Sequence, residues 1–76
     1  MQKHHHGFHE LFAQLGLPNN DLAIRQFLAE HFLDEKERLA EAKFWNSAQA
    51  QFLCEGWRDD ADWAEVIDRL DTSLRH

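Results

Sequence analysis

The segment from Asp59 to Leu74 constrains the fold most, because both the start of a helix and its buried face can be read from it. Aspartates gather at its beginning, where unpaired backbone N–H groups and the helix dipole favour negative charge: Asp59, Asp60 and Asp62. Apolar residues then recur at spacings of three and four and form a single stripe, made of Trp63, Val66, Ile67, Leu70 and Leu74. The segment therefore predicts an amphipathic helix that packs one face into a core.

Two further helices are predicted in the first half of the chain. The first carries an apolar stripe made of Phe8, Leu11, Phe12 and Leu15. Gly16 suits the position just after this helix, and Pro18 prevents its continuation. Asn19 or Asn20 is expected to cap the second helix, whose stripe consists of Ile24, Phe27, Leu28 and His31. The pattern breaks near Leu33, so residues 33–43 are predicted to form a loop or a short helical turn.

A third helix is expected from Asn46, which with Gln49 forms a capping box, to about Arg58. Its apolar residues fall on two sides: one stripe of Ala50, Leu53, Cys54 and Trp57, and a second of Ala48 and Phe52. A helix that is apolar on two sides is either central in its domain or touches a partner. The chain is thus predicted to be all-α, a compact bundle of about four short helices. Residues 1–7 are expected to be a flexible N-terminus and residues 8–76 a single helical domain.

Composition narrows the classes of function. Fourteen acidic against eight basic residues give 76 residues a formal net charge of −6, and the basic residues are dispersed. Nucleic acid and anionic membrane surfaces are therefore not expected as partners. The single cysteine rules out an internal disulfide, and the N-terminus lacks the apolar region of a signal peptide. We expect a cytoplasmic protein.

Four motifs together resemble a family of small bacterial single-domain proteins of unknown function. They are residues 12–18 (FAQLGLP), 44–45 (FW), 48–53 (AQAQFL) and 60–66 (DADWAEV), in this order. The resemblance extends from about Phe8 to Leu74 and implies a compact helical protein without an assigned activity or known catalytic residues. The chain departs from the family pattern at residues 34–43, where a loop containing Pro or Gly is expected.

Histidines offer the most obvious candidate ligands. His4, His5, His6 and His9, with Glu10 beside them, have spacings at which imidazoles can share a metal on a helix. Gly7 interrupts such a helix, and the alternative is a polar terminus that binds metals only adventitiously. His31 lies near the end of the second predicted helix. It is either a pH-sensitive ligand contact or a half-buried residue that satisfies the helix-end carbonyls, and we favour the second interpretation.

Cys54 and the aspartates have structural interpretations. A reactive thiol needs an electropositive and accessible setting, whereas Cys54 lies in an apolar stripe, so we predict a small core residue. Asp60 and Asp62 match two positions of a calcium loop, but Ala64 and Glu65 break the rest of that pattern. Helix capping explains these carboxylates instead. The sequence contains no phosphate-binding glycine loop and no arrangement of nucleophile, base and orienting group, so we expect neither an enzyme nor a cofactor.

The aromatic residues provide the functional hypothesis. We predict a non-enzymatic interaction or adaptor protein that binds an unknown protein partner, or a second copy of itself, near the third helix. The predicted interaction surface consists of Phe44, Trp45, Phe52 and Trp57, although nine aromatic residues are also what a core this small needs. The alternative is a protein that binds a small ligand or a metal through its His residues and an aromatic-lined pocket.

Overall fold

The computed structural model describes residues 7–75, which form four α-helices and one 3-10 helix. They are α1 (Phe8–Gln14), α2 (Asp21–Glu30), η1 (Leu39–Glu41), α3 (Ser47–Asp59) and α4 (Ala61–Leu74). The prediction of an all-α bundle of about four short helices is confirmed, and η1 is the short helical turn expected within residues 33–43. The flexible N-terminus predicted at residues 1–7 lies outside the described residues, apart from Gly7.

Local sequence determines where α1 and α3 begin or end. Gly16 adopts a φ of +73°, and its N–H donates to the carbonyl of Ala13 while Leu17 N–H donates to that of Phe12. This is the Schellman arrangement, in which a glycine takes the left-handed conformation at low cost. At the start of α3, Asn46 Oδ1 accepts from Gln49 N–H at 2.7 Å, and Gln49 Oε1 accepts from Asn46 N–H at 2.9 Å. The predicted capping box is therefore present.

The predicted helix start at Asp59 is wrong by two residues. Asp59 is the last residue of α3, and α4 begins at Ala61. Asp60 separates them with an extended backbone at φ −138°, and its carboxylate accepts from the N–H groups of Asp62 at 3.0 Å and Trp63 at 3.4 Å. Capping by an aspartate is thus confirmed, but Asp60 alone is the cap. Asp59 cannot be, because α3 continues through Gly56 and ends at Asp59.

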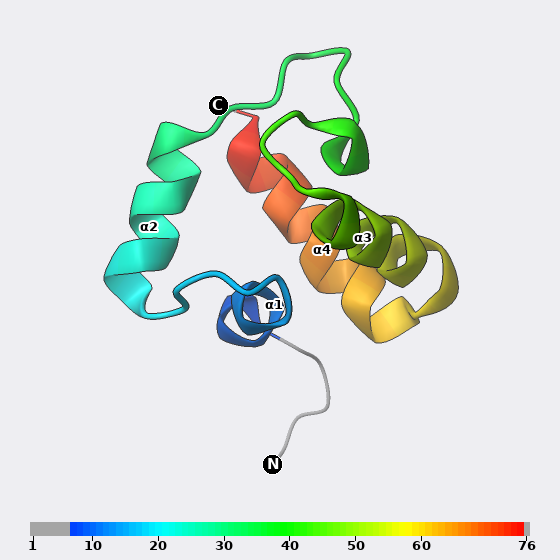
Figure 1. Cartoon of the computed structure of the whole chain (residues 1–76), viewed down its shortest axis with the longest axis horizontal. Helices are drawn as coiled ribbons and strands as arrows, with labels where there is room; N and C mark the ends of the chain where they lie inside the picture. Colours follow the sequence, from blue (N-terminus) through cyan, green and yellow to red (C-terminus); the bar gives the residue numbers. More distant parts are fainter. Residues whose placement is uncertain (1–6, 76) are drawn as a thin grey trace.

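Helix α4 lies at the centre of the molecule and contacts all three other α-helices (Figure 1). Of its predicted stripe, Trp63 is half-buried and the other four residues are buried, together with residues of α1 and α3: Val66, Ile67, Leu70 and Leu74, with Leu11, Phe12 and Leu53. The end of α4 also meets the segment that follows α2, because Leu33 N–H donates to the carbonyl of Leu74 at 2.9 Å. In residues 7–75, each helix is too short or too polar to cross a membrane.

Helix α3 turns a different face to the core than its apolar stripes predicted. Leu53 and Gly56 are buried, and Phe52 packs edge-on against Trp63 of α4 with ring centroids 5.3 Å apart. Cys54 and Trp57 are exposed instead, so the prediction that Cys54 is a core residue is wrong. The reason lies at Gly56, where the absence of a side chain lets Ile67 and Trp63 approach the α3 backbone.

Candidate functional site

A groove of about 470 Å³ opens between η1, α3 and the C-terminal half of α4. Its floor is apolar and consists of Leu39, Leu53 and Ile67, all buried. Trp57 stands at its side with 49% of its surface exposed. A rigid helix thus presents a large aromatic side chain beside an apolar depression, which is an arrangement typical of binding sites.

The η1 wall of the groove is held from the inside by a tryptophan. Trp45 is only 8% exposed, and its indole Nε1 donates to the carbonyl of Leu39 at 2.8 Å. Its ring stacks on Phe27 of α2 at a centroid distance of 5.6 Å. The buried N–H therefore has a partner, and the same hydrogen bond fixes the first residue of η1.

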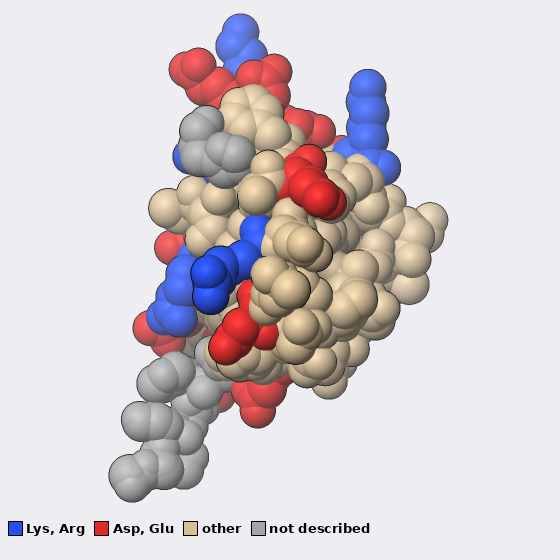
Figure 2. All heavy atoms as spheres, turned by 90° about the vertical axis from the view of Figure 1, so that its left-hand side faces the viewer, with Lys and Arg blue, Asp and Glu red and all other residues tan. Residues whose placement is uncertain are grey.

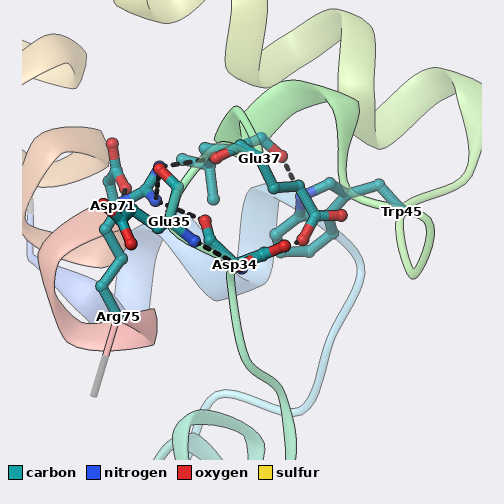
Figure 3. A network of polar contacts seen from close by, with 7 residues as sticks. Asp34, Glu35, Glu37, Trp45, Asp71 and Arg75 are labelled. Carbon is teal, nitrogen blue, oxygen red and sulfur yellow. Dashed lines mark hydrogen bonds and ion pairs between the residues drawn. The ribbon is translucent and has the colours of Figure 1, made fainter.

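Arg75 holds the loop before η1 from the outside (Figure 3). Its Nη1 donates to the carbonyl of Asp34 at 2.8 Å, its Nη2 to that of Glu37 at 2.7 Å, and its Nε contacts Asp71 Oδ1 at 2.5 Å. The planar guanidinium is suited to reaching several acceptors at once. Nη1 also donates to the carbonyl of Glu35 at 3.4 Å, so one residue just after α4 connects three loop carbonyls and one carboxylate and keeps the loop close to the core.

Two arginines stand at the groove without a strong internal partner. Among residues 7–75, the guanidinium group of Arg38 makes no hydrogen bond or ion pair, while its backbone carbonyl accepts from Glu41 N–H at 3.0 Å. Arg58 contacts only the exposed carboxylate of its neighbour Asp59, at 3.1 and 3.3 Å. The hydrogen bonds that Arg58 donates to the Asp59 carboxylate, and then the negative charge of that carboxylate, raise the pKa of Arg58 above its ordinary value. An arginine side chain carries its positive charge at any ordinary pH, so both guanidinium groups can donate to an acceptor on a ligand.

The four residues predicted as one interaction surface do not share a surface. Trp45 is buried, and half-buried Phe44 lies beside it. The ring centroid of Phe44 is 5.9 Å from that of Phe27 and 4.7 Å from that of His31. Phe52 is half-buried between α3 and α4. Trp57 alone of the four lines the groove. The sequence thus identified one groove residue and one residue that supports the groove from beneath.

The histidines that can be described have structural contacts. His31 is half-buried, and its Nδ1 lies 2.9 Å from the carbonyl of Phe27, which confirms the predicted helix-end role. His9 Nε2 contacts the exposed Asp21 Oδ1 at 2.7 Å. Within residues 7–75, no group of three His, Cys, Asp or Glu side chains is placed to hold a metal ion. His4, His5 and His6 lie outside this range.

The face that α2 presents carries charges of both signs. Figure 2 shows Lys and Arg interspersed with Asp and Glu there, with uncharged surface between them. Leu22 at the start of α2 is 62% exposed on this helix and lines neither the groove nor the smaller hollow of about 190 Å³ beside His31. This face therefore offers no single-sign field to a highly charged partner.

Sequence reasoning missed the arginines and the η1 wall. Arg38 and Leu39 lie in the segment without helical periodicity, so nothing local indicated that they face α3. Arg75 follows Asp71 by four residues, a spacing that predicts an ion pair on a helix. That signal indicated the Asp71 contact, but it contained no information about the loop carbonyls.

Comparison with known proteins identifies the family and nothing more specific. Neither the curated proteins nor the solved structures contain a match to the chain. The family described as "Protein of unknown function (DUF2789)" matches residues 1–74. The earlier resemblance to a small family of unknown function is thereby confirmed. The chain belongs to the DUF2789 family of proteins of unknown function.

Proposed function

We propose that this protein is a non-enzymatic protein-interaction module and that the groove between η1, α3 and α4 is its binding surface. The observation that carries the proposal is Trp57, half exposed beside a floor made of buried apolar side chains. Tryptophan is the residue type most enriched among those that dominate binding energy at interfaces. Trp45 and Arg75 hold the η1 wall in place, so a ligand would meet a site that is already formed.

The lining of the groove favours binding over catalysis. Cys54 is its only nucleophile of the thiol or hydroxyl type, and none of the described lining residues is a histidine that could act as its base. Of the two carboxylates in the lining, Asp71 is occupied by Arg75, and no hydrogen bond within the described residues orients Glu41 toward Cys54. Without a nucleophile, a base and an orienting group in reach of one another, a reaction has no apparent machinery here.

The openness of the groove favours a protein segment over a small molecule. Pockets for small molecules bury most of the ligand's surface, about 70–90%. Here the aromatic wall itself is half exposed, so a small ligand would remain in contact with water. The alternative, a small-ligand site, has one feature in its favour, the hollow of about 190 Å³ lined by Phe12, Phe27 and His31.

The test is a selection of peptides on the purified full chain. A phage library displaying random peptides of about 12 residues, enough to span a site of this size when extended, is selected on the wild type. The enriched peptides are then synthesised and titrated into the wild type, Trp57→Ala and Leu22→Ala. Leu22 is the matched control because it is also an exposed large apolar residue but does not line the groove.

We expect enriched peptides that bind the wild type and Leu22→Ala equally and lose at least about tenfold in affinity on Trp57→Ala, the size of a hot-spot effect. Thermal unfolding of both variants controls for folding. Peptides that bind Trp57→Ala as well as the wild type would overturn the proposal. So would a selection that enriches nothing while a small-molecule thermal-shift screen, repeated on His31→Ala, finds a ligand of the second hollow. If sedimentation shows a dimer that depends on Trp57, the occupant of the groove is a second copy of this chain and not another protein.

A further inference from the structure

The groove gathers three arginines at its edge in a molecule that is negatively charged as a whole. The chain has a formal net charge of −6. Yet the groove is lined by three arginines, Arg38, Arg58 and Arg75, against two carboxylates, Glu41 and Asp71. Asp59, the partner of Arg58, lies next to this lining, so the arginines matter as hydrogen-bond donors and not as a net charge. Arginine donors next to apolar surface favour a ligand that has both an apolar group and a negative one.

The arginines of the groove have different roles. The N–H groups of Arg75 already donate to Asp71 and to loop carbonyls, so few of them remain for a ligand. The side chain of Arg38 has no partner among the described residues, and that of Arg58 has only the exposed Asp59, which water or a ligand can replace. Arg38, the residue before η1, and Arg58, near the end of α3, both line the groove, so a ligand there meets arginines from two separate segments of the chain.

Resting on the proposed function, we infer that the groove binds a segment of a partner protein in which an apolar side chain is accompanied by an Asp or Glu. The apolar side chain lies on Leu53 and Ile67 against Trp57. The carboxylate is held by Arg38 and Arg58 through charge-assisted hydrogen bonds, which are the stronger kind.

The charge of the molecule argues against other anionic occupants. A polyanion such as nucleic acid or an anionic membrane would bring many negative charges close to a chain that already has an excess of six. A second copy of the chain would bring the same excess with it. One or two carboxylates on a short segment can use the arginines without this repulsion.

The experiment uses the selected peptides and neutral variants of both molecules. Each Asp or Glu of a Trp57-dependent peptide is changed to Asn or Gln, and binding is titrated to the wild type, Arg38→Gln and Arg58→Gln. Arg25→Gln is the matched control, because Arg25 is an exposed arginine on α2 whose loss changes the net charge equally but which does not line the groove.

We expect neutralising one peptide carboxylate to weaken binding to the wild type about tenfold, and to weaken binding to Arg38→Gln or Arg58→Gln much less. Arg25→Gln should behave as the wild type. Trp57-dependent peptides that lack acidic residues, or that bind all three arginine variants equally, would overturn this inference and leave the interaction module intact. Loss of Trp57 dependence itself would be the failure of the proposed function.

Discussion

Gly56 is the residue on which the contact between α3 and α4 depends. A Cβ placed there would lie 2.9 Å from Ile67 Cδ1 and 3.3 Å from Trp63 Cβ. Alanine favours a helix over glycine by about 1 kcal/mol, but overpacking a buried contact costs about 1–3 kcal/mol. We therefore expect Gly56→Ala to lower the free energy of unfolding, measured by urea denaturation, by about 1 kcal/mol.

The control removes the methyl group of Ile67 that a Cβ at Gly56 would meet. In an Ile67→Val background Cδ1 is absent and only the 3.3 Å contact with Trp63 Cβ remains, so Gly56→Ala should cost less there and the two changes should be non-additive. If Gly56→Ala has the same cost in both backgrounds, or stabilises the wild type, Gly56 is not needed for the helix contact.

Arg75 is the second single residue that connects distant parts of the chain. Because it donates to the carbonyls of Asp34 and Glu37 while only a third of its side chain is exposed, Arg75→Ala should cost about 1–1.5 kcal/mol of unfolding free energy. Arg75→Lys should recover little, since an ammonium lacks the planar fork. Urea denaturation gives the values, and Arg69→Ala, an exposed position of the same helix, should lie within about 0.5 kcal/mol of the wild type. Equal effects at both positions would show that the loop does not depend on Arg75.

At the scale of single elements, Gln49 joins α3 to α1. Its side-chain oxygen completes the capping box, while its Nε2 donates to the carbonyl of Leu15 at 2.7 Å. Glutamate suits a capping box as well as glutamine does. Gln49→Glu nevertheless replaces the donor with a carboxylate that faces a carbonyl, so we expect a loss of about 1–2 kcal/mol in urea denaturation at neutral pH.

The comparison with Asn46→Ala separates the two roles of the capping box. That change removes the cap alone and should cost about 1 kcal/mol. If Gln49→Glu stabilises the protein, as a purely local cap would predict, the contact with α1 contributes nothing measurable.

The elements were predictable where their signals are local. Gly16 after α1, the Asn46–Gln49 box and the stripe of α4 each lie within a few residues of the feature that they determine. The boundary at Asp60 was less accessible, because three nearby aspartates are all suitable caps. Only the extended backbone of Asp60 distinguishes it, and that depends on how α3 ends.

The apolar stripes of α3 illustrate what periodicity leaves open. They indicated that Leu53, Cys54 and Trp57 share a face, but apolar surface can line a core or an open groove equally well. The close approach at Gly56 orients α3 so that Leu53 is covered and Trp57 is not. That approach joins residues in two helices, and no window of sequence contains it.

At the scale of the whole molecule, the groove is assembled from three separate stretches of chain. Leu39 comes from η1 and Arg38 from the residue before it, Trp57 and Arg58 come from α3, and Asp71 comes from α4. Their proximity depends on the packing of Trp45 beneath η1 and on the contacts of Arg75. The sequence predicted that aromatic residues near the third helix form a binding surface. Only the fold shows that Trp45 is buried and supports η1, whereas Trp57 is exposed.

The most direct test of the groove as the binding surface is the indole N–H region of the NMR spectrum, because the three tryptophans have different surroundings. Trp45 is buried and bonded to Leu39, Trp63 packs on Phe52, and Trp57 is half exposed in the groove. Assignment follows from single Trp→Phe variants. On titration with a selected peptide, the account predicts that the Trp57 resonance shifts most while that of Trp45 stays in place. A peptide that leaves the Trp57 resonance unchanged while it shifts that of Trp63 or Trp45 would contradict it.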